Sequence, residues 1–156
     1  MSTIEMSVPA TPAELFAVLS DGWMYAGWVV GASHIRDVDE HWPEVGARVH
    51  HTVGVWPFTI KDRTVVLAME PDRMLELDAR AWPVGRAHVR IELSPGGGGR
   101  TRIRMVENVA GGPGRLVPKP LTDPALDARN REALHRLADI AIGRRTAVQS
   151  TPAQSR

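Results

Sequence analysis

The sequence has 156 residues, a length typical of one domain with enough chain to bury a substantial core. It contains no cysteine, which excludes disulfides, thiolate catalysis and cysteine-based zinc or iron–sulfur sites. The formal net charge of +1 provides no overall field that would select nucleic acid or an anionic membrane, so we expect neither as a partner.

Signals near the two ends of the chain, together with its hydropathy, predict its location and its domain bounds. Residues 1–20 lack the basic start and apolar run of a secretory signal, and no stretch approaches the roughly 20 apolar residues of a membrane span. We therefore expect a cytoplasmic protein with one domain over residues 1–143. Residues 144–156 are polar and without periodicity, which is typical of a disordered tail.

A short strand and a helix are expected first. Residues 4–8 alternate between apolar and polar side chains, the period-2 pattern of a half-buried strand. The segment 11–14, Thr-Pro-Ala-Glu, matches a capping box with proline at the first helical position, so a helix begins here and ends near residue 22. A second short helical or irregular segment is expected over residues 23–30.

Regularly spaced turns divide the middle of the chain into six further strands. Prolines and glycines interrupt runs of β-branched or alternating residues, and proline cannot donate to a strand ladder, so these sites mark strand ends. Short turns join the strands into an antiparallel meander, and the strands cover residues 33–39, 47–55, 59–69, 74–82, 86–94 and 100–109.

A long amphipathic helix follows. Asp123 fits its N-cap and Pro124 its first helical position. An apolar stripe at helical spacing, broken only by Asn130, runs from Leu126 to Ala141. The sequence therefore predicts an α+β fold, in which a curved antiparallel sheet of about seven strands buries its apolar face against this helix. A wide curl of the sheet would leave a cavity between the two.

Several local motifs follow one another in a characteristic order: Leu19–Trp23, Trp28–Ala32, Trp42-Pro43 with Gly46, Gly54–Pro57 and Arg129-Asn130. Together with the order of elements, they resemble the START-like superfamily, often called SRPBCC, and within it a bacterial polyketide cyclase/dehydrase-type subgroup. The superfamily includes the birch pollen allergens, lipid-transfer domains and polyketide cyclases. The resemblance spans about residues 3–143 and implies the helix-grip fold with a hydrophobic ligand cavity. It implies no reaction, because members include carriers, sensors, chaperone regulators and enzymes.

Glu107 is the most informative candidate for a site. Ile103, Met105 and Glu107 share one face of the last strand, and the apolar pair marks that face as the inner one. We therefore expect Met105 and Glu107 to line the cavity. Desolvation raises the pKa of a carboxyl group buried without a partner, so Glu107 could act as a general acid or base. Alternatively, a bulge turns Glu107 outward, or it is paired near the end of the sheet.

The long helix supplies three more candidates, Arg129, Asn130 and Leu134. A buried amide needs hydrogen-bond partners, and a ligand carbonyl or Glu107 could bond to Asn130; the alternative is a structural bond to a nearby loop. Arg129 could pair with a carboxylate or an acidic ligand, or it could be a solvated flank. We expect all three to contact the ligand and take Glu107 and Asn130 as candidate catalytic residues.

The adjacent His50 and His51 do not form a metal site. Neighbouring residues of a strand point to opposite faces, so the two imidazoles cannot bind one ion without distortion. We therefore predict neither metal nor cofactor, and expect one of the pair to line the cavity, without identifying which. Asp62 could also face inward, although the alternation of its strand leaves its face open.

Aromatic residues fall near the predicted ends of elements: Trp23, Tyr25, Trp28, Trp56 and Trp82. Rings at these positions could frame the mouth of a pocket and stack on an aromatic or polycyclic ligand, although core packing is the commoner role for any single one. The resemblance favours Trp28 and Trp56 as lining residues.

These features predict the binding or transport of a hydrophobic small molecule, such as a polyketide, lipid or aromatic metabolite, by a monomer or homodimer. An alternative is a cyclase or dehydratase, in which Glu107 or a cavity histidine removes an acidic proton next to a carbonyl. Asn130, with Arg129, would stabilise the enolate. A third hypothesis is a protein-interaction or stress-response module with a vestigial cavity. The sequence does not identify the ligand.

Overall fold

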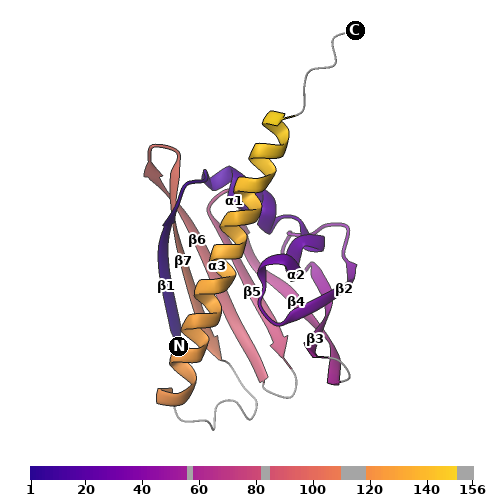
Figure 1. Ribbon diagram of the computed structural model, residues 1–156. Helices are drawn as coiled ribbons and strands as arrows, with labels where there is room; N and C mark the ends of the chain where they lie inside the picture. Colours follow the sequence, from indigo (N-terminus) through magenta and orange to yellow (C-terminus); the bar gives the residue numbers. More distant parts are fainter. Residues whose placement is uncertain (56–57, 82–84, 110–118, 151–156) are drawn as a thin grey trace.

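The computed structural model describes residues 1–55, 58–81, 85–109 and 119–150, and its main elements are one curved antiparallel sheet and one long helix (Figure 1). The sheet contains β1 (Ser2–Val8), β2 (Ala32–Val38), β3 (Arg48–Val55), β4 (Phe58–Glu70), β5 (Met74–Ala81), β6 (Gly85–Gly97) and β7 (Arg100–Val109). The helices are α1 (Pro12–Leu19), the 3-10 turn η1 (Gly22–Met24), α2 (Tyr25–Trp28) and α3 (Lys119–Ser150).

The seven strands form one sheet in the order β1-β7-β6-β5-β4-β3-β2, and every neighbouring pair is antiparallel. The meander predicted from the turn spacing is therefore confirmed, and β1 closes the sheet by pairing with β7, where Ile4 faces Met105 and Ser2 faces Glu107. Register shifts interrupt the β2–β3, β4–β5 and β6–β7 pairs. Such irregularities bend and twist strands, which helps the sheet to curl.

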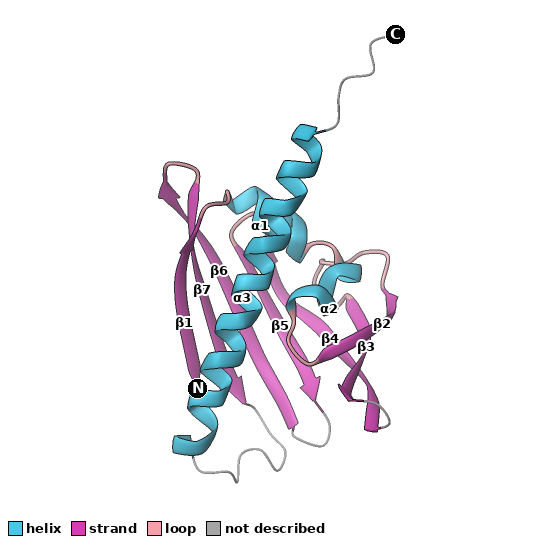
Figure 2. Ribbon diagram, in the orientation of Figure 1, coloured by secondary structure: helices cyan, strands magenta, loops and turns pink. Residues whose placement is uncertain are grey.

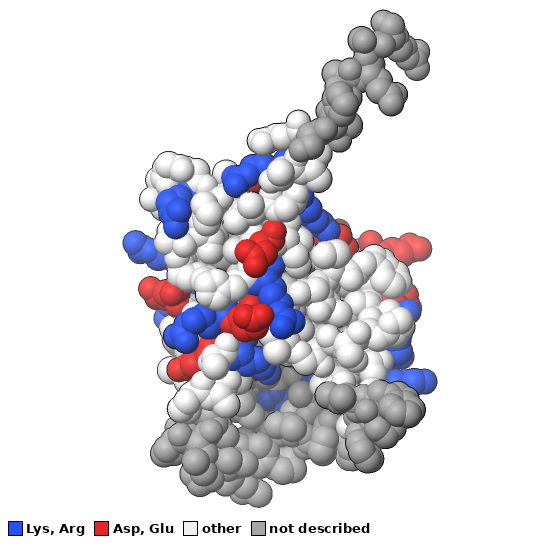
Figure 3. Space-filling view, in the orientation of Figure 1, with Lys and Arg blue, Asp and Glu red and all other residues white. Residues whose placement is uncertain are grey.

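Helix α3 runs across the concave face of the sheet (Figure 2). Its buried side recurs at helical spacing and consists of Ala133, Leu134, Leu137, Ala138 and Ala141. The opposite side of the helix carries side chains of both charges (Figure 3). Two of them form an ion pair, in which Arg136 Nε lies 2.7 Å from Glu132 Oε1. This arrangement is the helix-grip fold that the sequence predicts.

Both ends of α3 differ from the sequence-based expectation. The helix begins at Lys119, so Pro124 lies inside it rather than at its first position. A proline near the start removes only one backbone hydrogen bond, so this signal located the boundary wrongly. At the other end the helix continues to Ser150, through part of the expected tail. Arg144 Nη2 bonds to Asp21 Oδ2 at 2.6 Å, which ties this extension to the body. Residues 151–156 lie outside the described residues.

Local contacts fix the path of the segment between β1 and β2, which contains α1, η1 and α2. The expected capping box is present, because Glu14 N donates to Thr11 Oγ1 at 3.2 Å and Thr11 N donates to Glu14 Oε2 at 2.8 Å. The indole of Trp42 then closes the end of α1 by donating to Leu19 O at 3.1 Å. At Gly22 a β-carbon would lie 2.5 Å from Val38 Cγ1, so the close approach of η1 to β2 requires glycine.

Alanine substitutions at Gly22 and Gly143 should change the free energy of unfolding in opposite directions. Gly22→Ala should destabilise the fold by about 1–3 kcal/mol, because a β-branched neighbour has to move. Gly143 lies on the exposed side of α3, where a β-carbon would meet no heavy atom of the described residues within 4 Å. Gly143→Ala should therefore stabilise by up to about 1 kcal/mol through helix propensity. Urea denaturation measures both, and a neutral Gly22→Ala would contradict the close packing of η1.

Candidate functional site

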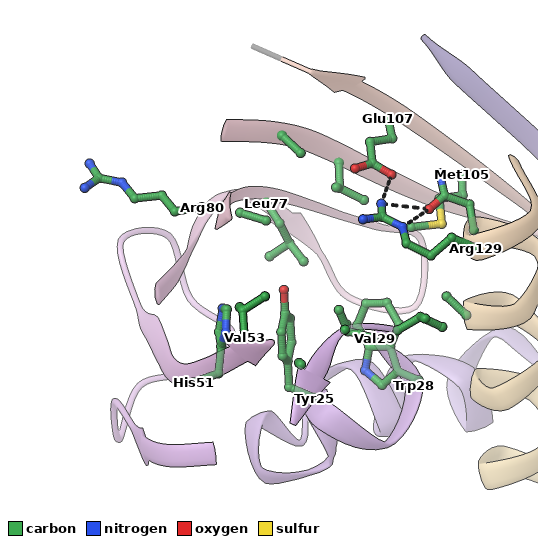
Figure 4. A pocket seen from close by; sticks show the side chains of 18 residues that line it. Tyr25, Trp28, Val29, His51, Val53, Leu77, Arg80, Met105, Glu107 and Arg129 are labelled. Atoms are coloured by element: carbon green, nitrogen blue, oxygen red, sulfur yellow. Dashed lines mark hydrogen bonds and ion pairs between the residues drawn. The ribbon is translucent and has the colours of Figure 1, made fainter. Parts of the chain in front are cut away.

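A cavity of about 280 Å³ lies between α2, the beginning of α3 and the inner face of the sheet (Figure 4). Most of its wall is apolar and comes from side chains that include Trp28, Val29, Val53, Leu77, Val89 and Met105. Arg80 also borders the cavity, but its side chain extends away from it. The polar groups of the wall gather in two places, one at α3 and β7 and the other at α2 and β3.

The first group, the acid–arginine cluster, consists of Glu107, Arg129, Asn130 and Ser2. Arg129 Nη2 donates to Glu107 Oε2, and the same nitrogen donates to Asn130 Oδ1 at 3.0 Å. Asn130 Nδ2 donates to Ser2 Oγ at 3.2 Å, and Ser2 Oγ donates to Asp127 Oδ1 at 2.5 Å. The cluster therefore joins β1, β7 and the first part of α3 by charge-assisted hydrogen bonds.

Glu107 is buried in the cavity wall with only 2% of its side chain exposed, because β7 alternates and its inner face includes Ile103 and Met105. Of the alternatives that the sequence left open for Glu107, the structure has a paired carboxylate on the inner face: the guanidinium of Arg129, itself 40% exposed, compensates the charge. Oε1 of Glu107 takes part in no hydrogen bond within the described residues. One carboxylate oxygen is therefore available to a ligand.

The second group, the hydroxyl–imidazole cluster, consists of Tyr25, Thr64 and His51. The hydroxyls of Tyr25 and Thr64 lie 2.8 Å apart, and His51 Nε2 lies 3.1 Å from Thr64 Oγ1. The rings of Tyr25 and His51 stack with centroids 5.3 Å apart and an interplanar angle of 23°. His51 Nδ1 is buried and has no hydrogen-bond partner in the described residues.

Burial keeps this second cluster uncharged at neutral pH. Desolvation raises the pKa of Tyr25 to about 12, partly offset by its bond to Thr64 and by the charge of Arg129. Desolvation also lowers the pKa of His51, although the nearby Asp62 acts in the opposite direction. The wall at α2 and β3 therefore presents a phenol, a hydroxyl and a neutral imidazole.

The structure brings together most of the residues that the sequence singled out. Trp28, His51, Met105, Glu107, Arg129 and Asn130 all line the cavity. Their roles in binding or catalysis remain predictions. Tyr25 belongs to the wall as well, although the sequence placed it only among aromatics that could frame a mouth. Thr64 was missed, because no local pattern marks a strand threonine as a partner of two distant residues.

Three residues that the sequence placed at the ligand do not border the cavity: His50, Leu134 and Asp62. His50 points to the outer face of β3, where its Nε2 lies 3.6 Å from Asp39 Oδ1, because alternation turns His51 inward instead. Leu134 is fully buried in the core, and the neighbouring Ala133 lines the cavity in its place.

Asp62 is buried directly opposite His51 on β4 but does not border the cavity. Trp56 and Trp82 lie outside the described residues, and Trp23 is exposed. Among the described residues no group of three or more histidine, aspartate or glutamate side chains could hold a metal ion. In the same part of the chain no helix combines the length and the apolar character that a membrane crossing requires.

The cavity between sheet and helix has its counterpart in a known family. Residues 1–141 match the family described as polyketide cyclase / dehydrase and lipid transport. The chain belongs to this family. No curated protein matches the sequence. The family and the fold support the binding of hydrophobic ligands in general.

Solved structures share the fold at low sequence identity. A protein from Arthrobacter aurescens has a TM-score of 0.68 and 16% identity over 90% of this chain and 85% of its own. A Staphylococcus aureus protein of unknown function reaches 0.67 at 9% identity, over 95% and 96% of the two chains. The protein Ara h 8.0201 reaches 0.66 at 14% identity, over 90% and 96%. These likenesses concern the fold alone.

The ionisation of Tyr25 tests the burial of the hydroxyl–imidazole cluster. Tyr25 is the only tyrosine in the sequence, so the ultraviolet absorbance of tyrosinate reports on it alone. The midpoint should lie at about 12 in the folded protein, against about 10 in the urea-unfolded chain. Since the folded pKa is the higher one, the associated stability is complete below pH 10 and is lost as the pH rises from about 10 to about 12. A native midpoint near 10 would contradict burial.

Proposed function

We propose that this protein binds or carries a hydrophobic small molecule, such as a polyketide, lipid or aromatic metabolite, inside the cavity. The observation that carries the proposal is an apolar hollow beneath α3 whose wall contains two separate groups of polar atoms. Ligand sites combine a mainly apolar lining with a few placed polar groups in this way. Membership of a family that includes lipid transport supports the same conclusion.

The volume of the cavity limits the size of the ligand. At about 280 Å³ it is close to the lower end of the range for small-molecule pockets. It corresponds to the space of about nine water molecules in the liquid. A compound of one or two rings, or a short acyl chain, suits this space better than a lipid with two long chains.

Native mass spectrometry of the purified protein before and after mild organic extraction tests the proposal. We expect an adduct that extraction removes, and an increase in thermal stability when suitable hydrophobic compounds are added, because a ligand that binds only the folded state stabilises it by mass action. A protein that carries no adduct and gains no stability from any ring compound or short fatty acid would contradict the proposal.

A matched pair of substitutions locates the binding inside the cavity. Ala87 lines the cavity, whereas Ala128 is exposed on α3. Ala87→Phe should fill much of the space and weaken binding by at least about tenfold, while Ala128→Phe leaves affinity unchanged. Equilibrium dialysis measures the affinities, and circular dichroism confirms that both variants fold. Equal affinities in the two variants would place the ligand elsewhere.

A second candidate function, a cyclase or dehydratase, is favoured by the carboxylate of Glu107. Glu107 lines the cavity and its Oε1 has no hydrogen-bond partner in the described residues, so this oxygen could take a proton from carbon next to a ligand carbonyl. The electron pair would then move to the carbonyl oxygen. Hydrogen-bond donors of Arg129 and Asn130 lie in the same part of the wall and could stabilise that oxygen.

Glu107→Gln separates the enzyme from the carrier. With a poly-β-ketone substrate, an enzyme should lose at least about 100-fold in turnover, because the amide cannot accept the proton, while binding of an uncharged ligand is largely kept. Glu92→Gln is the control, since Glu92 lies in the charged network of the outer face with Arg90 and Arg104. A Glu107→Gln variant that turns over substrate at the wild-type rate would exclude Glu107 as the base.

A further inference from the structure

The imidazole of His51 contains an unusual polar atom. Its side chain lines the cavity, the residue is only 3% exposed, and Nδ1 has no hydrogen-bond partner in the described residues. Buried polar groups in proteins are nearly always hydrogen-bonded, so an unpartnered one in a residue that lines a cavity needs an explanation. A ligand that supplies the missing partner provides it.

The other ring nitrogen indicates what kind of group the ligand presents. His51 Nε2 bonds to the hydroxyl of Thr64, which can either donate or accept. Nδ1 is therefore an acceptor in one tautomer and a donor in the other. A ligand hydroxyl satisfies both cases because it can donate and accept, whereas a carbonyl satisfies only the second.

The charges around the cavity select against ionised ligands. Glu107 and Arg129 compensate each other, and the hydroxyl–imidazole cluster is neutral because burial lowers the pKa of His51 and raises that of Tyr25 to about 12. A buried carboxylate would thus meet a cation that is already paired, and a buried amine would meet an anion that is already paired. Ionised groups without compensation are costly to bury.

The aromatic residues of the wall suit a flat ligand. Tyr25 stacks on His51 and meets Trp28 edge to face, with centroids 5.5 Å apart, so three rings in mutual contact form one aromatic part of the cavity wall. Aromatic side chains in a wall favour stacked or edge-to-face contacts with a ligand ring. Together with the small volume, this favours one or two fused rings over an acyl chain.

We propose that the cavity selects an uncharged aromatic compound of one or two rings that bears a hydroxyl group, and that His51 Nδ1 forms a hydrogen bond to this hydroxyl. The inference rests on the proposed binding function and specifies its ligand class. It also assigns a different role to each polar cluster. The hydroxyl–imidazole cluster recognises the ligand hydroxyl, and the acid–arginine cluster keeps the opposite wall polar without net charge.

Three probes with one ring system test the selectivity: 2-naphthol, naphthalene and 2-naphthoate. Equilibrium dialysis at neutral pH gives their affinities for the wild-type protein. We expect 2-naphthol to bind about tenfold more tightly than naphthalene, since one additional hydrogen bond is satisfied. We expect 2-naphthoate to bind the most weakly of the three.

Substitutions of His51 identify the recognising atom. Gln places its amide near the position of Nε2 and can keep the bond to Thr64, whereas the shorter Asn places its amide near Nδ1. His51→Gln should therefore lose the tenfold preference for 2-naphthol and still bind naphthalene, which also shows that the variant is folded. His51→Asn should keep the preference, at least in part. His50→Gln is the control on the outer face and should behave as the wild type.

Glu107→Gln provides an independent test of the charge argument. Removing the carboxylate leaves the guanidinium of Arg129 bonded to Asn130 but without an anionic partner, so 2-naphthoate should gain at least about tenfold in affinity, while naphthalene is unaffected. Glu92→Gln on the outer face should change neither affinity.

The outcomes distinguish this inference from the proposed function. Equal binding of 2-naphthol and naphthalene, or tightest binding of 2-naphthoate to the wild type, overturns the inference while hydrophobic binding stands. A preference for 2-naphthol that survives His51→Gln also overturns it. If no probe binds, or if binding is insensitive to Ala87→Phe, the proposed function fails as well.

Discussion

The packing of α3 against the concave face of the sheet is the contact on which the rest of the molecule depends. Alanine and leucine side chains form its buried side, which packs against β1, α1 and α2, and Leu134 and Leu137 are inaccessible to solvent. Nearer its N-terminal end, Ala133 and Asn130 leave the space unfilled, and the cavity opens there. One helix therefore contributes side chains both to the hydrophobic core and to the wall of the cavity.

Two polar clusters remain inside this apolar setting, and each is stabilised in a different way. The acid–arginine cluster contains full charges, so it needs the ion pair between Glu107 and Arg129 and the bonds through Asn130 and Ser2. Removing Arg129 would leave the buried carboxylate of Glu107 uncompensated and cost several kcal/mol, whereas removing the carboxylate leaves a guanidinium that is 40% exposed and partly solvated. The hydroxyl–imidazole cluster avoids that cost because burial keeps Tyr25 and His51 uncharged.

The two clusters lead to different functional hypotheses for one cavity. A charged pair with an available carboxylate oxygen provides a possible base, whereas a neutral imidazole with an unpartnered nitrogen provides a possible recognition group. Both fit a family whose description includes cyclases, dehydrases and lipid transport. The apolar wall is common to both, so both hypotheses begin with the binding of a hydrophobic ligand.

The sequence by itself determined the strands, the meander, the capped first helix and the inward face of Glu107, because alternation, proline and glycine act over a few residues. It did not determine where α3 begins and ends, since Pro124 is tolerated inside a helix and the contact of Arg144 with Asp21 joins distant residues. Only the tertiary structure decided that His51 rather than His50 borders the cavity, that Ala133 replaces Leu134, and that Thr64 joins Tyr25 to His51. These outcomes depend on the register between strands and the rotation of one helix over the sheet, and no local pattern encodes either.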